Sequence, residues 1–139
     1  MTIPSRLGNR DRAPVPDNEA VAGAGALRPP FVPLVHANSV QRKMMPVVSG
    51  VLDYFPDAIA AVAFISFLGN QKHNPGEPLH WSRGKSDDHI DCAGRHMLRR
   101  DQLDQDGIME GAEMVWRALA WLQLAIEKTY DLPPSSGSR

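Results

Sequence analysis

Two pairs of acidic residues have a spacing that could build a metal site. Asp88 and Asp91 lie three residues apart, and Glu110 and Glu113 repeat this spacing after eighteen intervening residues. Residues three apart lie on the same face of a helix. Four carboxylates on two neighbouring antiparallel helices can surround Mg²⁺ or Mn²⁺, which prefer oxygen ligands. The pattern therefore indicates a divalent-metal site formed by these four residues.

Each pair also has a simpler interpretation. Apolar residues such as Ile90 and Met97 lie opposite the two aspartates, as on any amphipathic surface helix, so that the aspartates could form a solvated face. Downstream, apolar residues surround the predicted helix nearly completely, which is typical of a buried helix, and buried carboxylates need a partner or a metal. Glu110 and Glu113 also fall in the first turns, where the helix dipole favours negative charge. The sequence leaves these interpretations open for both pairs.

The elements that carry these residues are predicted to be helices. A short helix over residues 36–55 is interrupted by Pro46, and a second over residues 56–74 begins at Pro56 and Asp57 and has Gly69 near its end. A third runs from a cap at Ser86 to about residue 102, and a fourth from about residue 106 to about residue 129. Since no run alternates with a period of two for long enough to make a sheet, the fold class is all-α, a bundle of about four main helices.

Composition divides the chain into three parts. Residues 1–34 form a Pro/Gly-rich N-terminal arm, residues 35–130 the helical domain, and residues 131–139 a disordered tail. The prolines and glycines of "NPGEPLHWSRG" predict a loop before the third helix.

Charge and hydropathy restrict the partners. A net charge of −1 gives no broad basic field, so we expect no nucleic-acid partner. The longest apolar run, "AIAAVAFISFL", is too short to span a bilayer, and the N-terminus lacks the apolar segment of a signal peptide. The only cysteine, Cys92, cannot form an internal disulfide. We expect a cytoplasmic protein without a membrane partner.

The region from Pro56 to Glu127 resembles the phage dATP/dGTP diphosphohydrolases, a MazG-like group within the all-α NTP pyrophosphohydrolase superfamily. It looks closest to the MazZ type, which occurs alongside 2-aminoadenine synthesis. The matching pieces, in order, are "PDAIAAVA", "GNQKH", "HW", "DCAGRHML" and "DGIMEGAEMVWRALAWLQLAIE". The superfamily carries a Glu-x-x-Glu pair and a Glu-x-x-Asp pair on successive helices, whereas the first pair here is aspartate. Many relatives in the phage group have histidine where this chain has Glu110 and Glu113.

The resemblance implies a MazG-like bundle and a reaction in which a purine (d)NTP and water give (d)NMP and pyrophosphate with Mg²⁺ or Mn²⁺. The leading substrate is dGTP, with GTP and dATP as secondary candidates. Asp87 or Glu110 would orient the attacking water. The resemblance also implies a homodimer or a dimer-of-dimers tetramer, and, for a phage protein, the cytoplasm of the host cell.

A triphosphate bound beside carboxylates needs cations to bind its phosphates, an aromatic side chain on which the purine can stack, and polar groups that contact the base. The candidate substrate-binding residues are Lys72, Asn74, Trp81, Arg83, Lys85, Arg95 and His96. Each has a structural alternative: solvated surface charge for the cations, a turn role for Asn74, the edge of the core for Trp81, and a partly buried histidine for His96. His73 and His89 are expected at the surface, and Trp116 in the core or a subunit contact.

Two other functions compete with this one. A non-enzymatic helical interaction module would carry the same acids merely as surface and cap residues. A different metal phosphohydrolase, such as an HD-type triphosphohydrolase, needs an adjacent His-Asp pair, whereas this chain has "HID".

Overall fold

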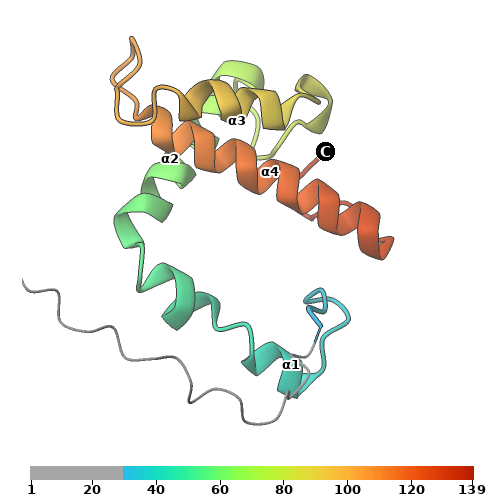
Figure 1. Cartoon of the computed structure of the whole chain (residues 1–139). Coiled ribbons are helices and arrows are strands. Elements are labelled where there is room, and N and C mark those ends of the chain that lie inside the picture. The colour runs from blue at the N-terminus through green and yellow to red at the C-terminus, as the bar shows by residue number, and fades with distance from the viewer. Residues whose placement is uncertain (1–29) are drawn as a thin grey trace, which may run out of the picture. The chain divides into compact units, whose positions relative to one another are not determined.

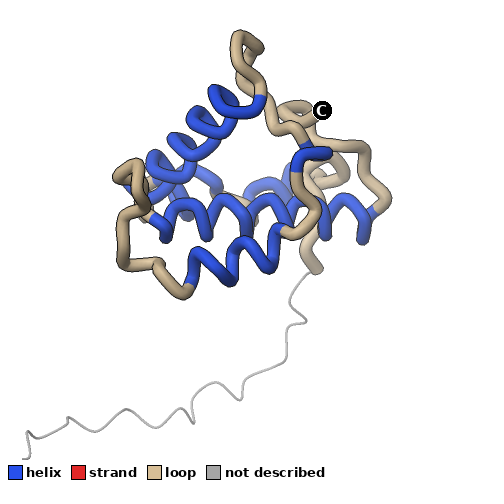
Figure 2. Tube along the Cα trace, turned by 90° about the horizontal axis from the view of Figure 1, so that it is seen from above, coloured by secondary structure: helices blue, strands red, loops and turns tan. Residues whose placement is uncertain are grey.

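The computed structural model describes residues 30–139, which form four α-helices, one π-helical turn and one short 3₁₀ helix (Figure 1). Within this range there is no strand, only two isolated β-bridges, and Figure 2 shows helices and loops alone. The all-α prediction is therefore confirmed. All the helices of the described residues belong to the unit Val32–Arg139. Most of the predicted N-terminal arm, residues 1–29, lies outside the described residues.

The first helical region is interrupted, as the sequence predicts. Helix α1, Ser39–Lys43, begins with a capping box in which the Asn38 side chain accepts from the Gln41 N–H and the Gln41 side chain accepts from the Asn38 N–H. The π-helical turn η2, Val48–Leu52, follows Pro46, which cannot continue a helix because it lacks an N–H.

Helix α2, Pro56–His73, begins at the predicted residues. Pro56 occupies the first turn, where its missing N–H is not needed, and Asp57 complements the helix dipole there. The helix ends at His73, four residues beyond Gly69 and one residue before the end of the predicted range 56–74. It packs against α4, where the Trp116 indole N–H donates to the Ser66 hydroxyl at 2.8 Å.

Helix α3, His89–Met97, is shorter at both ends than the predicted Ser86–Gln102 range. Its N-cap residue is Asp88, and Ser86 donates to the Asp88 carboxylate instead of capping the helix. After Met97, the N–H groups of Arg99 and Gln102 bond three residues back, so the chain continues as tight turns. The 3₁₀ helix η3, Arg83–Lys85, precedes α3 in the predicted loop.

Helix α4, Glu110–Tyr130, begins four residues later than predicted. A tight turn takes up the preceding segment, because the Asp104 carboxylate accepts from the N–H groups of Asp106 and Ile108 at 2.9 and 2.8 Å. Gly107 has a φ of +78°, which a side chain would make unfavourable. The turn delivers Glu110 to the first position of the helix, as the metal-site interpretation requires.

Helix α4 contacts both α2 and α3, and Figure 1 shows α3 running alongside it. At the start of α4, a Cβ on Gly111 would lie 3.0 Å from the Arg100 carbonyl oxygen. The absence of a side chain at Gly111 therefore lets the segment after α3 approach the first turn of α4 closely. This approach holds the end of α3 against Glu110.

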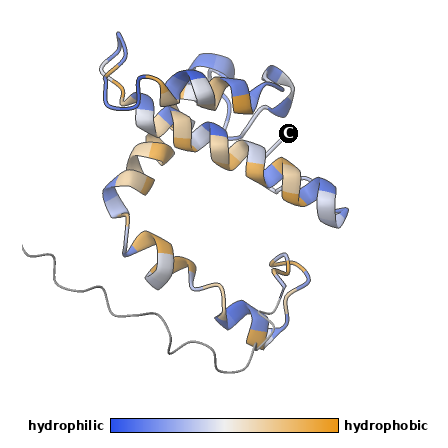
Figure 3. Cartoon of the chain, viewed as in Figure 1, coloured by the Kyte–Doolittle hydropathy of each residue, from blue (hydrophilic) through white to orange (hydrophobic). Residues whose placement is uncertain are grey.

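The buried hydrophobic residues among residues 30–139 are small. The buried hydrophobic side chains are Ala37, Val62, Cys92, Ala112 and Ala120, and no large side chain among residues 30–139 is fully buried. On α4, Leu119 and Leu122 are 48% and 45% exposed, although a helix apolar on nearly all sides is expected to be buried. Figure 3 shows hydrophobic residues in orange along both α2 and α4.

The predicted disordered tail differs from the structure. The Trp81 N–H donates to the Gly137 carbonyl, and the Trp81 carbonyl accepts from the Arg139 N–H. Arg83 adds a side-chain hydrogen bond to the Ser138 hydroxyl at 2.6 Å. These bonds give residues 131–139 a defined path against the loop, which composition alone does not reveal.

No single helix within residues 30–139 has both the length and the apolar character needed to cross a membrane. Ser39–Leu52 and Pro56–His73 meet that test only when taken together, with a 92° bend between them.

Candidate metal centre

The structure brings two carboxylates and one imidazole together where α3 meets α4. Nδ1 of His96 lies 2.6 Å from Oε2 of Glu110 and 3.2 Å from Oε2 of Glu113. One potential ligand atom from each of the three residues lies within 4.8 Å of the others. Imidazole nitrogen and carboxylate oxygen are both common metal ligands, so the donor set suits Mn²⁺ or another divalent ion of intermediate hardness. We refer to His96, Glu110 and Glu113 as the His-Glu-Glu cluster.

Glu110 is the buried member of the cluster, with 3% of its surface exposed. It is the first residue of α4, where the helix dipole favours an anion. Its second oxygen accepts from Arg99 at 2.9 Å, so both oxygens have partners. The helix-dipole interpretation and the buried-partner interpretation therefore both apply to this one residue.

Glu113 is half-buried and has a weaker set of partners. Burial raises its pKa, and the nearby carboxylates of Asp104 and Glu110 raise it further, while His96 and Arg117 act in the opposite direction. A carboxylate crowded by other carboxylates gains most from an added cation. The electrostatics at Glu113 therefore favour binding of a metal ion.

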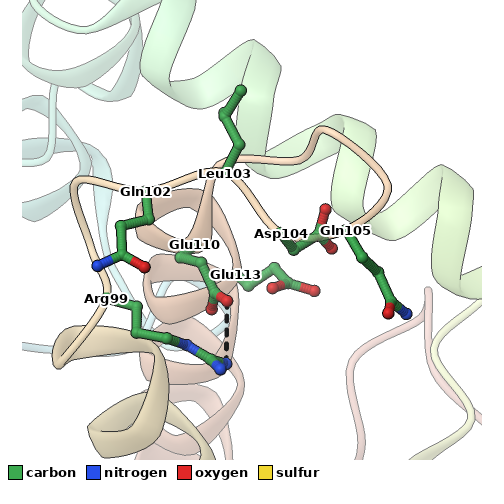
Figure 4. Close-up of a pocket in the computed structure, with 7 residues that line it drawn as sticks. All are labelled: Arg99, Gln102, Leu103, Asp104, Gln105, Glu110 and Glu113. Atoms are coloured by element: carbon green, nitrogen blue, oxygen red, sulfur yellow. Dashed lines mark ion pairs between the residues drawn. The ribbon is translucent and has the colours of Figure 1, made fainter.

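The two glutamates line a pocket of about 440 Å³ on the outer side of the cluster. Figure 4 shows the carboxylates of Glu110, Glu113 and Asp104 gathered on one side of it, with Arg99 paired to Glu110 and Leu103 pointing away. The remaining lining residues are Gln102 and Gln105. An acidic, polar pocket of this size can hold a hydrated cation together with part of a charged ligand.

Asp88 and Asp91, the other predicted ligands, do not join this cluster. Asp88 is exposed before α3, where it accepts from Ser86 at 2.8 Å and from Arg95 at 3.0 Å. These hydrogen bonds hold the pKa of Asp88 well below its usual range. Asp91 is exposed on the same side of the helix. The solvated-face interpretation therefore fits both aspartates.

The reason lies in the register of α3. The residues of α3 that are turned inward are His89, Cys92 and His96, which are spaced three and four residues apart. This face places a histidine, rather than an aspartate, opposite the glutamates of α4. Asp87, the alternative candidate for orienting water, is exposed on the segment before α3.

The predicted substrate-binding residues are scattered. Lys72 and Lys85 are exposed, and Arg95 is occupied by Asp88. Arg83 forms a two-pronged ion pair with Glu127, with Nη2 and Oε1 at 2.8 Å. Only His96 lies at the carboxylate cluster.

Arg83 and Glu127 hold the loop to the end of α4. Glu127 is 7% exposed, and the hydrogen bonds from Arg83 lower its pKa to about 2. Because this carboxylate neutralises Arg83, the guanidinium is not available as a free phosphate-binding cation.

Asn74 and Trp81 have structural partners that match the alternatives considered for them. The buried Asn74 side chain accepts from the Ser82 hydroxyl at 2.7 Å and donates to Asn70 at 3.1 Å, which fixes the turn after α2. The Trp81 ring packs edge-on against Trp116 with 6.0 Å between centroids, and the Arg83 guanidinium lies 4.6 Å from its centroid. Trp81 thus covers the edge of the α3–α4 contact.

Sequence reasoning missed several residues around the cluster. Arg99 and Asp104 line the pocket, and Arg99 follows His96 at a helical spacing of three, which could have placed it near the same carboxylate. His89 was predicted at the surface but is 3% exposed, because it occupies the inward face of α3. Its burial could have been recognised from the seven-residue spacing to His96.

Comparisons of this chain with protein-family models, with curated proteins and with solved structures find no match.

Proposed function

We propose that this protein is a metal-dependent nucleotide pyrophosphohydrolase that converts a purine (d)NTP, with dGTP as the leading substrate, to (d)NMP and pyrophosphate. The observation that carries the proposal is the His-Glu-Glu cluster at the edge of an acidic pocket. The sequence resemblance to MazG-like enzymes supports the same reaction class. It also favours a role in phage nucleotide pools that supply 2-aminoadenine DNA, in the cytoplasm of the host cell.

In this proposal, Glu110, Glu113 and His96 hold Mn²⁺ or Mg²⁺. The metal would neutralise charge on the phosphates and lower the pKa of an attacking water. Asp88 and Asp91 are not part of this ligand set. Where the resemblance implies four carboxylates, we therefore propose two carboxylates and an imidazole.

The chain's own residues would orient the reactants. Glu110 is fixed by His96 and Arg99, so its position is well defined before any ligand binds. Between the two candidates for orienting water, this favours Glu110 over the exposed Asp87. Gln102 and Gln105 line the same pocket and offer amide donors and acceptors to a polar ligand.

We also propose that the protein acts as a homodimer or a dimer-of-dimers tetramer. Its buried hydrophobic residues are small, and the apolar side chains of Leu119 and Leu122 on α4 and of Phe64 and Phe67 on α2 are about half exposed. Large exposed apolar surfaces typically mark subunit contacts. Light scattering of the full chain tests this part: a monomer at micromolar concentration would contradict it.

The same apolar surfaces favour a second candidate, a non-enzymatic helical interaction module. Such a module needs no metal, so its melting temperature would not respond to Mn²⁺. The pyrophosphohydrolase is expected to melt at a higher temperature in Mn²⁺, because a ligand that binds only the folded state stabilises it.

The experiment that tests the proposed reaction is incubation of the full chain with dGTP and Mn²⁺, with products separated by ion-exchange chromatography. We expect dGMP and pyrophosphate, and their loss in Glu113→Gln. Asp101→Asn is the matched control, because Asp101 is an exposed acid on the segment between α3 and α4. Release of inorganic phosphate or triphosphate would assign another hydrolase class, and no turnover of any purine triphosphate would contradict the proposal.

A further inference from the structure

Arg117 is a half-buried arginine on α4 whose hydrogen-bonding partners are all neutral. Its Nη1 lies 2.9 Å from the Ser86 hydroxyl and 3.3 Å from Nδ1 of His89. The ion-paired arginines of the described residues are Arg83, Arg95, Arg99, Arg100 and Arg139. Within residues 30–139, no carboxylate lies within ion-pairing distance of Arg117. The positive charge of this guanidinium is therefore balanced by no direct ion pair in the described part of the chain.

Arg117 lies on the same helix as two members of the His-Glu-Glu cluster, Glu110 and Glu113. It follows Glu113 by four residues, so the two side chains share a face of α4 about 6 Å apart along the helix axis. A chain of phosphates held at Glu113 through a cation can therefore reach Arg117 without crossing to another helix.

His89 supplies an independent sign that this corner of the molecule lacks a partner. Because Arg117 can only donate, Nδ1 of His89 must accept, and the ring proton must lie on Nε2. Nε2 is buried and has no hydrogen-bond partner, although His89 itself is 3% exposed. Buried side-chain donors in proteins almost always have an acceptor, and an unmet one often marks a missing water or ion. The His89 ring lies beside Trp81 and Trp116, with 5.7 and 6.2 Å between ring centroids, and neither indole offers Nε2 a hydrogen-bond acceptor. A ligand with an acceptor atom would supply one.

Two neighbours hold the guanidinium in place. The Ser86 hydroxyl accepts from Arg117 and donates its own proton to Asp88, and the Trp116 ring lies against the guanidinium with 5.6 Å from its centroid to the Arg117 carbon. Stacking on an aromatic ring restricts the rotation of an arginine and leaves its donor edge directed outward. A planar, oriented guanidinium is suited to two parallel hydrogen bonds to phosphate oxygens.

We infer that Arg117, held in place by Ser86 and His89, forms a phosphate-binding subsite that binds the polyphosphate of the ligand beside the His-Glu-Glu cluster. The inference rests on the proposed function for the identity of the ligand as a nucleoside triphosphate, but the anion subsite itself does not require turnover. Arg117 is assigned as a positioning residue that orients phosphates relative to the cluster.

The test measures binding of inorganic tripolyphosphate to the full chain by calorimetry in a buffer containing EDTA, so that no metal contributes. We expect Arg117→Gln to weaken binding at least about tenfold, as for loss of one charge-assisted contact. Arg117→Lys keeps the positive charge but loses the two parallel donors of the guanidinium. We expect its affinity for tripolyphosphate to lie between those of the wild-type protein and Arg117→Gln. Arg100→Gln is the matched control, because Arg100 is an exposed arginine of the neighbouring segment paired with Asp101.

Circular dichroism of each variant establishes that it is folded. If Arg117→Gln does not fold, Ser86→Ala and Arg117→Lys carry the test, each with a smaller loss of affinity. Absence of tripolyphosphate binding by the wild-type protein, or equal binding by folded Arg117 variants, would overturn the inference even if dGTP were hydrolysed. Loss of binding in Arg117→Gln, without dGTP turnover by the wild-type protein, would support the subsite and reject the proposed reaction.

Where dGTP is hydrolysed, a second readout separates positioning from general structure. Arg117→Gln is expected to raise KM and lower kcat while leaving the Mn²⁺ affinity within about twofold, because the metal ligands are untouched. A fall in Mn²⁺ affinity equal to that of Glu113→Gln would mean that Arg117 only supports the cluster, and would overturn the phosphate assignment.

Discussion

The two acidic pairs have the same spacing in the sequence and opposite environments in the structure. Asp88 and Asp91 lie on the exposed side of α3, and Asp88 is already occupied by Arg95 and Ser86. Glu110 and Glu113 lie where α3 meets α4, next to an imidazole and an acidic pocket. Carboxylate spacing therefore identifies candidate metal ligands, whereas burial and the side chains of the neighbouring helix decide which pair can bind a metal.

The two acidic pairs are expected to differ most in their effect on the turnover of dGTP. Glu113→Gln removes the charge of a proposed ligand, so we expect turnover of dGTP in Mn²⁺ to fall by about 10³-fold. The measurement is the initial rate of dGMP formation at saturating substrate. A variant that keeps more than a tenth of the wild-type rate would show that Glu113 is not a ligand.

The next effect is on stability. Glu110→Ala leaves His96 and Arg99 without their buried partner, and we expect the free energy of unfolding to fall by about 4 kcal/mol. Urea denaturation measures the change. Asp88→Ala provides the comparison, because its exposed carboxylate should leave the urea midpoint unchanged. Equal shifts in the two variants would contradict the difference in environment between the pairs.

A third prediction concerns the ion pair of Arg83 and Glu127, which lies outside both acidic pairs. The folded-state pKa of Glu127 is lowered to about 2 from an ordinary value of 4.5, so its stabilisation is fully present above pH 4.5 and is lost as the pH falls toward 2. The shift corresponds to about 3 kcal/mol. The pH-dependent stabilisation by this ion pair should be absent in Glu127→Gln. Acid unfolding followed by circular dichroism measures it. An unchanged acid transition would show that the pair does not stabilise the folded chain.

A smaller effect is expected on the pH dependence of metal binding. Glu113 must be deprotonated to bind a metal, and its pKa is raised, so Mn²⁺ affinity should begin to fall at a pH above the ordinary glutamate value of 4.5. Asp104→Asn removes one of the charges that raise this pKa and should move the decline to lower pH. Calorimetric titrations at a series of pH values measure both. A shift to higher pH in Asp104→Asn would contradict the electrostatic account.

The smallest effect is expected at the exposed pair. Asp91→Asn should leave both turnover and Mn²⁺ affinity within about twofold of the wild type, as for an ordinary surface substitution. Steady-state kinetics and calorimetry check this. A large loss would return Asp91 to the ligand set and would require α3 to rotate in the functional state.

The helices themselves could be predicted from local signals. Pro56 and Asp57 begin α2, and Pro46 interrupts the first helical region, because both effects depend on a few neighbouring backbone groups. The end of α3 could not be placed, because tight turns follow Met97, and the start of α4 could not be placed, because it depends on the hydrogen bonds of the Asp104 turn.

The site was predicted in part for the same reason. Glu110 and Glu113 were identified because helical spacing and first-turn position are readable from one segment. Asp91 was expected beside the two glutamates, but His96 lies there. Which of the two residues faces α4 depends on the rotation of α3 about its axis, and tertiary packing sets that rotation. Arg83 and Arg117 could not be distinguished as paired and unpaired cations, because their neighbours come from distant parts of the chain.

The central claim is that the metal binds at His96, Glu110 and Glu113 and not at the aspartates of α3. The most direct measurement is a Mn²⁺ titration followed by electron paramagnetic resonance, comparing the wild-type protein with Glu113→Gln and with the double variant Asp88→Asn, Asp91→Asn. The account predicts that the double variant binds Mn²⁺ as the wild type does, whereas Glu113→Gln leaves the ion free in solution. Retained binding in Glu113→Gln together with loss of binding in the double aspartate variant would contradict it.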